Sequence, residues 1–243
     1  MIRGVKLYGL FIFSGLGFLA LIALGLWQLE RREWKEALLA DLGHALSPSA
    51  EALDIWAAES ELAHRDFIRV KLQGRFDNAQ ERYLFAVLEG QTGWQVIAPF
   101  ITTDRRLVLV NRGFVPDRLK DSRSRPQSLI EDETELTGLL RRKPKAGMFT
   151  PANQPSRNIW YWADVDALLA SVPDATRLRP VNGLVQALSS GDEAPWPRPV
   201  PPDPSAIPNN HLQYAFTWFA LAVVLLVMTF SLLRSGRLRD GSG

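Results

Sequence analysis

Two uncharged apolar runs near the ends of the chain limit most strongly what this sequence can fold into. The first run, 7–29, has 23 residues and the second run, 212–233, has 22 residues. An α-helix rises about 1.5 Å per residue, so roughly 20 apolar residues cross the hydrocarbon core of a bilayer. Neither run carries a polar stripe, which argues against two buried core helices. The sequence therefore predicts transmembrane helices over 7–29 and over 209–233, which includes the residues that lead into the second run.

Basic residues in two short tails predict the orientation of these helices. The tail 1–6 holds Arg3 and Lys6, and the tail 234–243 holds three arginines and one aspartate. Lys and Arg in short flanks resist translocation, whereas a long domain crosses largely regardless of its charge. We therefore expect both tails in the cytoplasm and residues 30–206 outside the cytoplasmic (inner) membrane of a bacterium. A cleavable signal peptide is disfavoured, because the first apolar run exceeds the roughly 7–15 residues of a typical signal h-region.

Composition excludes several classes of function. The net charge of +2 comes from the tails, because the residues between them carry 23 basic and 25 acidic side chains. The part between the tails is therefore not basic, which argues against nucleic acid as a partner. The chain has no cysteine, which excludes disulfides, thiolate metal sites and cysteine nucleophiles.

The segment between the apolar runs divides into helical and β-type parts. Helical periodicity predicts a stalk and a short helix within 30–64, the short helix lying near 48–60 behind an N-cap at Ser47. Alternating apolar and polar residues predict strands in an external domain, 65–188, and a proline-dense strap follows over 189–208. The predicted strands cover 67–76, 81–88, 94–101, 107–115, 135–140 and 158–162, with a helix at 164–171 and a return to the sheet at 179–188.

These elements together predict the fold class. We expect a membrane protein with two transmembrane α-helices, N- and C-terminal, that flank an external α+β domain. The strands of this domain are expected to be mainly antiparallel, as a sheet or a partly closed barrel, because closure hides strand edges that would otherwise pair with other chains.

His211 is the candidate functional residue, because it stands where the strap meets the second apolar run at the outer rim of the hydrocarbon core. Tyr214, Ala215, Trp218 and Ala222 follow at helical spacing below it. A neutral imidazole above such an apolar, aromatic slot can ligate a haem iron. In the alternative, His, Tyr and Trp act only as interfacial anchors whose polar tips lie in water. The residues alone leave both interpretations open.

The sequence offers no other chemistry of this kind. It contains no nucleophile–base set, metal-ligand cluster or phosphate-binding loop, so we expect no enzyme. Four basic residues near the outer end of the first run can neutralise haem carboxylates, namely Arg31, Arg32, Lys35 and Arg65. Solvation and pairing with neighbouring glutamates explain most of them without a ligand. A two-span sensor and an external hydrolase are weaker alternatives, because no output domain and no catalytic triad are visible.

Four motifs in order along the chain resemble a known family. They are Gly25-Leu26-Trp27-Gln28 with Arg31 and Trp34-Lys35, then Gly74-Arg75-Phe76-Asp77, then Val110-Asn111-Arg112-Gly113-Phe114-Val115-Pro116, and last Pro208-Asn209-Asn210-His211-Leu212-Gln213-Tyr214 with Thr217-Trp218-Phe219. This series, together with the two end spans, resembles the Surfeit locus family of cytochrome c oxidase assembly factors, of the bacterial type. Phe114 stands where the family usually has tryptophan.

The resemblance implies a role in maturation of the oxidase catalytic subunit, with haem a as transient cargo for insertion. It aligns His211 with the histidine proposed as the haem iron ligand, and it implies that Trp27, Tyr214 and Trp218 contact the cofactor, the two tryptophans as walls of a cleft between the spans. The implied partners are the catalytic subunit, the haem a synthesis machinery and membrane lipid. The alternative is a haem-independent membrane scaffold that stabilises the catalytic subunit. The other family-signature positions are Gln28, Arg31, Trp34, Gly74, Arg112, Gly113 and Asn210, with Arg112 expected at a strand end facing the membrane.

Overall fold

The structure is a computed structural model that describes residues 2–47, 49–173, 175–188 and 196–240. It divides into two compact units. The first, here called the helical unit, comprises Met1–Leu39 and Ser205–Gly243, and the second, the sheet domain, comprises Ala40–Pro204.

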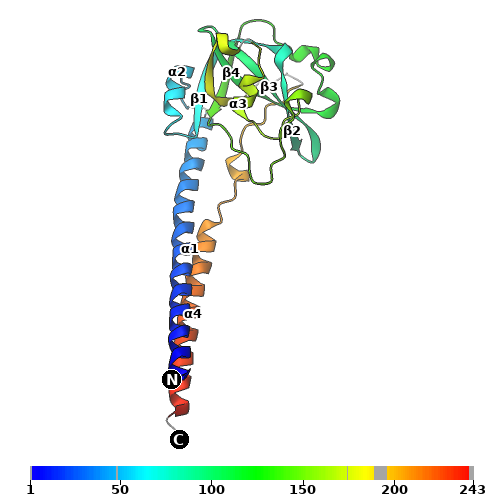
Figure 1. Ribbon diagram of the computed structural model, residues 1–243. Coiled ribbons are helices and arrows are strands. Elements are labelled where there is room, and N and C mark those ends of the chain that lie inside the picture. Colours follow the sequence, from blue (N-terminus) through cyan, green and yellow to red (C-terminus); the bar gives the residue numbers. More distant parts are fainter. Residues whose placement is uncertain (1, 48, 174, 189–195, 241–243) are drawn as a thin grey trace. The chain divides into compact units, whose positions relative to one another are not determined.

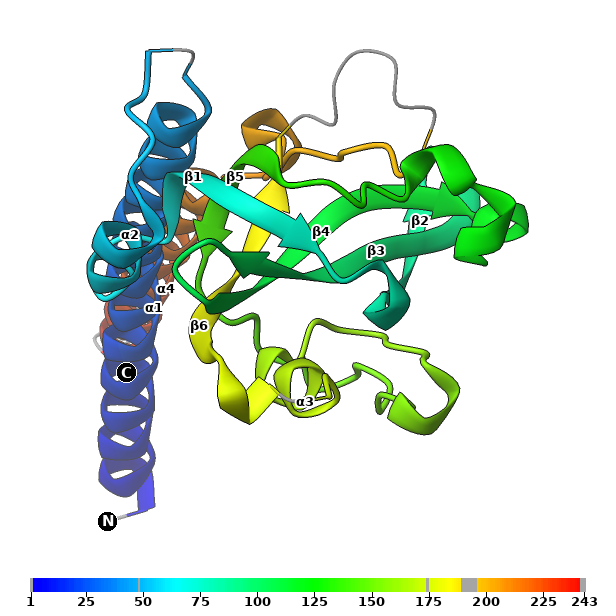
Figure 2. The same cartoon turned by 90° about the horizontal axis from the view of Figure 1, so that it is seen from above.

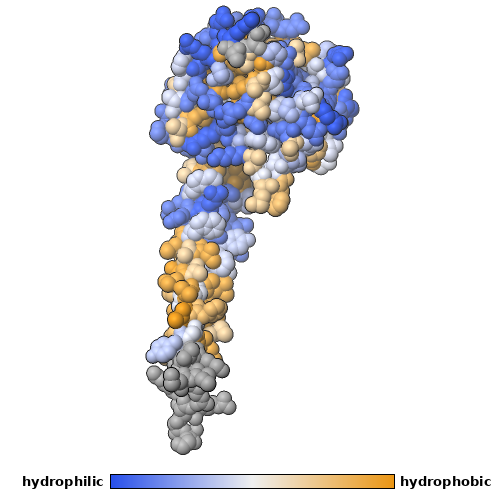
Figure 3. Space-filling model, in the orientation of Figure 1, coloured by the Kyte–Doolittle hydropathy of each residue, from blue (hydrophilic) through white to orange (hydrophobic). Residues whose placement is uncertain are grey.

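Two long helices, α1 (Ile2–Leu46) and α4 (His211–Asp240), contain both apolar runs (Figure 1). Both are long and apolar enough to cross a bilayer, which confirms the predicted helices. The prediction that the first helix continues beyond Leu29 is also confirmed, because α1 is unbroken to Leu46. Hydrophobic side chains cover the apolar stretches of both helices, whereas the visible face of the sheet domain is largely hydrophilic (Figure 3).

Small residues let α1 and α4 approach each other closely in an antiparallel pair. A Cβ built on Gly25 would lie 2.4 Å from the ring of Phe219, and one built on Gly17 would lie 3.3 Å from Leu225. Ala215 and Ala222 of α4 are buried at a spacing of seven residues. This spacing places both alanines on one face of the helix, so the two helices meet along a narrow seam.

The sheet domain is built from six strands: β1 (Phe67–Phe76), β2 (Arg82–Leu88), β3 (Gln91–Thr102), β4 (Arg106–Pro116), β5 (Thr134–Arg141) and β6 (Arg179–Ala187). Their order is β1-β5-β6-β4-β3-β2, and an additional β1–β3 pairing closes five of them into a ring, with β2 extending from β3. Every neighbouring pair is antiparallel except β4 and β6. The domain is thus a closed five-stranded barrel, in line with the predicted, mainly antiparallel architecture.

Gly74 makes the closure of the barrel possible. It pairs with Thr134 of β5 on one side and with Thr102 of β3 on the other. A Cβ on Gly74 would lie 2.2 Å from the carbonyl oxygen of Ile101, a separation that no side chain tolerates. A glycine is therefore required where β1 passes from one partner strand to the other.

Two hydrophobic clusters stabilise the barrel. The interior cluster draws side chains from all five barrel strands, including Val70, Phe100, Val110, Leu140 and Val185, and α2 (Ile55–Glu61) adds two of its own. The second cluster lies outside β3, β4 and β6, where α3 (Val165–Ala170) and its neighbours pack around Trp160 (Figure 2).

The predicted helix near 48–60 begins later than expected. Pro48 lies outside the described residues, and α2 starts at Ile55, where the carboxylate of Asp54 accepts a hydrogen bond from the backbone N–H of Ala57. The preceding residues are extended, because Leu53 forms a parallel bridge with Val70 of β1. Pairing with a strand edge therefore overrides the helical signal of Ser47 and the following proline.

The strand predicted over 158–162 is wrong. Only isolated bridges occur there, one between Trp160 and Leu84 and one between Ile159 and Gln154. Asn158 has a left-handed backbone with φ of 51°, which interrupts an extended conformation. Trp160 is buried as a single anchoring side chain and not as part of a strand.

Part of the strap, 189–195, lies outside the described residues. Beyond it, Arg198 pairs with Phe114 through two backbone hydrogen bonds of 2.8 and 2.9 Å. The side chain of Gln186 also donates to the carbonyl of Val200. Residues 198–200 of the strap are thus attached to the barrel. The expectation of a strap without helix is wrong at one place, because a short 3-10 helix, η7 (Pro204–Ala206), forms there.

Candidate functional site

The structure brings together two signature residues that are 183 positions apart in the sequence. His211, the first residue of α4, lies 2.7 Å through its Nδ1 from the Oε1 of Gln28 on α1. Gln28 is buried, and His211 is half-buried. Because an amide oxygen only accepts hydrogen bonds, Nδ1 is the protonated ring nitrogen and its N–H donates the hydrogen bond to Gln28. The lone pair of the imidazole is then on Nε2, the nitrogen that remains available to a ligand.

Two buried polar atoms near this pair have no hydrogen-bond partner. They are the Nε1 of Trp218 and the Oδ1 of Asn209. Trp218 lies two turns below His211 on the face of α4 that also carries the buried Ala215. Buried polar groups are normally paired, so these two atoms, one just before α4 and one two turns into it, are places where a ligand or ordered water can complete the hydrogen bonding.

Tyr214 is the most exposed residue of the predicted stripe on α4. Its neighbour Ala215 is buried in the seam, but Tyr214 itself is 54% exposed. Adjacent helical residues differ by about 100° in direction, so Tyr214 lies at the edge of the stripe formed by His211, Ala215 and Trp218. Asn210 precedes the helix, and its carbonyl accepts a hydrogen bond from the N–H of Tyr214.

The signature residues of α1 other than Gln28 lie on the surface of the helix. Trp27 is 52% exposed, and Trp34 is exposed beneath the guanidinium of Arg31, whose carbon lies 3.8 Å from the ring centroid. Arg32, in contrast, pairs with Glu36 at 2.7 Å. Because α1 and α4 are in direct contact at Gly25 and Phe219, a cleft walled by Trp27 and Trp218 stays a prediction.

The donor atoms of this site fit a haem group, which His211 would hold through its available Nε2. The His211–Gln28 pair is the arrangement typical of metal-ligating histidine, in which the second ring nitrogen donates to a fixed acceptor. Among the described residues, no group of three or more His, Asp or Glu side chains is placed to hold a metal ion by itself. A haem iron needs only one protein ligand, since the macrocycle supplies the other four nitrogens.

The Asn111-Arg112-Gly113 motif forms a β-bulge in β4. Val96 of β3 pairs with Gly113 and Ile97 pairs with Asn111, so Arg112 is the extra residue. Gly113 adopts a φ of 118°, and a Cβ there would lie 2.0 Å from the carbonyl oxygen of Arg198. The side chain of Asn111 accepts a hydrogen bond from the N–H of Gly113 at 3.0 Å. The bulge turns Arg112 towards the interior of the domain.

Arg112 belongs to a buried ion network centred on Glu81. Arg112 lies 3.4 Å from one carboxylate oxygen of Glu81, and Arg125 pairs with both oxygens. All three side chains are buried. One carboxylate therefore faces two guanidiniums. Arg112 also donates to the carbonyl of Ser128 at 2.5 Å and to the side-chain oxygen of Asn78 at 3.3 Å. Arg125 donates to the carbonyl of Leu119 at 3.0 Å and to the hydroxyl of Ser128 at 2.8 Å.

Burial also changes the acidity of groups in this network. Burial lowers the pKa of Arg112 to about 10, although the charge of Glu81 opposes this change. Burial, reinforced by the same carboxylate, raises the pKa of Tyr83 to about 12. Arg112 and Tyr83 are therefore in their ordinary ionisation states at neutral pH. The hydrogen bonds of Arg125 to Leu119 and Ser128 connect the segment 117–130 to the network.

This network corrects the expectation for Arg112. Residue 112 lies within β4 and not at a strand end, and its side chain is buried. Its partners Glu81 and Arg125 are buried as well, and sequence reasoning missed them. Glu81 lies in a polar stretch of the sequence, which is typical of a surface segment. The one sequence feature that pointed to this network was the presence of Arg112 in a family motif.

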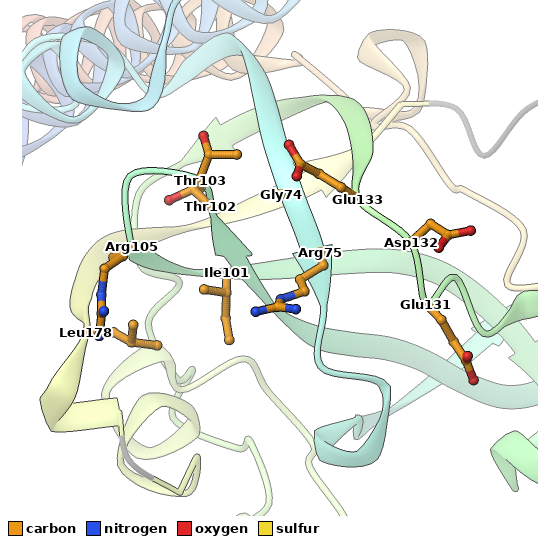
Figure 4. A pocket seen from close by; sticks show the side chains of 10 residues that line it. All are labelled: Gly74, Arg75, Ile101, Thr102, Thr103, Arg105, Glu131, Asp132, Glu133 and Leu178. Carbon is orange, nitrogen blue, oxygen red and sulfur yellow. The ribbon is translucent and has the colours of Figure 1, made fainter.

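A separate cavity of about 720 Å³ lies beside Gly74 in the sheet domain (Figure 4). Arg75 and Arg105 bring positive charge to its lining, and three consecutive acidic residues, 131–133, bring negative charge. Both arginines are exposed. This open, mixed-charge lining presents no nucleophile–base pair.

These features define the class of the protein. It has two terminal helices apolar enough to span a membrane, a closed β-barrel domain between them in the sequence, and a histidine held by a hydrogen bond between the two helices. The SURF1 family model matches residues 16–223, and the chain belongs to this family. It is 32% identical to a SURF1-like protein of Monosiga brevicollis, over 90% of this chain and 85% of the relative. It is 31% identical to Surfeit locus protein 1 of Homo sapiens (85% and 72%) and 28% identical to a SURF1-like protein of Rickettsia bellii (87% and 85%).

Proposed function

We propose that this protein is a membrane-anchored assembly factor for cytochrome c oxidase that holds haem a for delivery to the catalytic subunit. The hydrogen bond between His211 and Gln28 is the observation that carries this proposal. It leaves one imidazole nitrogen available at the start of an apolar helix, where a lipid-soluble cofactor can reach it. The protein is then a carrier and not an enzyme.

The chemistry of haem a suits a site on a membrane helix. Haem a carries a long isoprenoid tail, so it partitions into lipid, and a carrier at the bilayer edge avoids exposing it to water. When bound, haem contributes an iron that accepts one axial nitrogen ligand. Arg31 has no carboxylate partner among the described residues, unlike Arg32, and lies one turn beyond Gln28. It is placed to neutralise a haem carboxylate.

The proposed location follows from the charge of the tails. We place both termini in the cytoplasm and the sheet domain outside the inner membrane of a bacterium, because the basic residues are concentrated in the tails. Its partners would be the oxidase catalytic subunit, membrane lipid and the machinery that makes haem a.

A deletion experiment tests the proposed function. Cells that lack this protein are expected to assemble an oxidase catalytic subunit that is deficient in haem a, measured in the purified subunit by pyridine haemochrome analysis. Re-expression of the intact chain should restore the haem a content. A normal haem a content in the deletion strain would contradict the proposal.

A haem-independent scaffold is the second candidate function. Large apolar side chains on α4, including Phe216, Val223, Val227 and Phe230, face away from α1 and are exposed. Such a surface suits packing against transmembrane helices of a partner. A scaffold would co-purify with the catalytic subunit equally well when haem a synthesis is blocked, whereas a carrier would require haem for its effect.

Gln28 is expected to act as a positioning residue for His211. Gln28→Leu should weaken haem a binding by about 10–100-fold, because the imidazole loses the acceptor that fixes its tautomer. Gln28→Glu should retain binding, since a carboxylate oxygen also accepts from Nδ1. The measurement is haem titration by visible absorption, combined with the iron–histidine band in resonance Raman spectra.

The matched control for Gln28 is Gln213→Leu, because Gln213 is exposed on α4. This variant should bind haem a like the parent protein. If Gln28→Leu left both the affinity and the iron–histidine band unchanged, Gln28 would have no positioning role.

A further inference from the structure

The most exposed large apolar side chains in the described structure lie in the sheet domain and not on the membrane helices. Met148 is 92% exposed and Phe149 is 93% exposed. Among the large apolar side chains of α1 and α4 whose burial is described, the highest value is 78%, at Phe13. Exposing two adjacent apolar side chains to water is unfavourable. This pair therefore indicates a surface that is covered by something outside the chain.

The backbone around the pair forms a hydrogen-bonded turn. The N–H of Thr150 donates to the carbonyl of Gly147 at 3.1 Å, and the N–H of Gly147 donates to the hydroxyl of Thr150 at 2.9 Å. Met148 and Phe149 are the two central residues of this turn. The two side chains therefore project from the tip of a hydrogen-bonded turn.

Basic residues precede the turn. Arg142 pairs with Asp66 at 3.2 Å, and Lys143 pairs with Asp166 at 2.5 Å. Lys145 is exposed, and no ion pair involving it occurs among the residues that the structure describes. The tip thus combines an apolar pair with an unneutralised positive charge two residues before Gly147.

We propose that the turn Gly147–Thr150 inserts Met148 and Phe149 into the lipid surface, with Lys145 beside anionic headgroups. An apolar tip bordered by Lys or Arg is typical of peptide segments that bind an anionic bilayer interface. Protein interfaces, in contrast, are depleted in lysine. This inference rests on the proposed anchoring of α1 and α4 in a bilayer, and it assigns a third contact with lipid to the sheet domain.

The covalent connection to the membrane helices makes this contact feasible. Arg198, which is paired with Phe114 in the barrel, lies 13 residues before His211. A fully extended chain spans at most about 3.5 Å per residue, so this connection reaches no further than roughly 45 Å. A lipid surface is therefore always available to the domain at a high effective concentration.

A labelling experiment on the full chain tests the proposal. The chain has no cysteine, so single cysteines can carry an environment-sensitive NBD fluorophore in protein reconstituted into phosphatidylcholine vesicles that contain phosphatidylglycerol. Phe149→Cys reports the turn, Phe216→Cys reports anchoring of α4, and Val87→Cys is the control because Val87 is an exposed apolar residue of β2. Quenching by phospholipid with a nitroxide on its acyl chain is compared with quenching by aqueous iodide.

We expect the label at position 149 to be quenched by the nitroxide lipid several-fold more than the label at position 87, and to be protected from iodide. Lys145→Glu should reduce lipid quenching at position 149 on these vesicles and have less effect on pure phosphatidylcholine. Quenching at 149 equal to that at 87, with full access to iodide, would overturn the proposal. Protection that occurred only when the oxidase catalytic subunit was present would overturn it too, in favour of a protein partner.

The label on α4 separates this inference from the function on which it rests. Strong lipid quenching at position 216 without quenching at 149 would leave the anchoring intact and remove only the lipid contact of the turn. Weak quenching at position 216 would contradict the anchoring itself. Neither the quenching at position 149 nor the quenching at position 216 depends on the haem content of the protein.

Discussion

Replacement of His211 by alanine is expected to abolish the retention of haem a while α1 and α4 still form. The imidazole Nε2 has an available lone pair, and the 2.7 Å contact of Nδ1 with Gln28 fixes the orientation of the ring. Without this ligand, the cofactor would be held only by apolar contacts. The measurement is the haem a content per mole of protein purified in detergent.

Two comparisons make the result on His211 specific. His44→Ala is the matched control, since His44 is exposed on α1 and should leave the haem content unchanged. In His211→Gly, added imidazole should restore part of the haem binding, because a free ligand can occupy the space of the lost side chain. Undiminished haem in His211→Ala would exclude His211 as the ligand and leave it as an interfacial anchor.

Glu81→Gln is expected to cost about 3–5 kcal/mol of the free energy of unfolding, because removing one partner leaves a buried charge uncompensated. The glutamine keeps the shape of the side chain but removes the only carboxylate that faces Arg112 and Arg125 in this network. The loss should release the segment 117–130, which Arg125 holds to the barrel through Leu119 and Ser128. Denaturant unfolding followed by the intrinsic tryptophan fluorescence of the chain, to which the buried Trp160 contributes, measures the change.

The exposed pair Lys71–Glu135 provides the control for this prediction. Its nitrogen and oxygen lie 2.9 Å apart, and both side chains are more than half exposed. Exposed ion pairs contribute about 0–1 kcal/mol, so Glu135→Gln should have a small effect. Equal destabilisation by Glu81→Gln and Glu135→Gln would show that the buried network does not stabilise the domain.

Periodicity in the sequence predicted most of the fold. The apolar runs correctly predicted both long helices. Alternation of apolar and polar residues correctly predicted β1 to β5, and the segment expected to return to the sheet is β6. The errors occurred where tertiary contacts override local signals. Leu53 pairs with β1 and delays α2, and the left-handed Asn158 interrupts a segment whose residues favour a strand. Closure of the barrel depends on the β1–β3 pairing at Gly74, a long-range contact that no local pattern encodes.

The site was only partly predictable for the same physical reason. The position of His211 at the end of an apolar run was visible in the sequence. Its contact with Gln28 joins two distant helices, and Gln28 entered only through a family resemblance. The bulge at Arg112 breaks the alternation of β4, and the burial of Glu81 follows from that bulge. A charged residue in a polar stretch gives no local sign that it will be buried.

The visible absorption spectrum of the detergent-purified protein tests the central claim most directly. Protein from cells that make haem a should show the bands of bound haem a, and protein from cells unable to make haem a should lack them. A colourless protein from haem a-producing cells, isolated together with the oxidase catalytic subunit, would contradict the carrier role and support the scaffold.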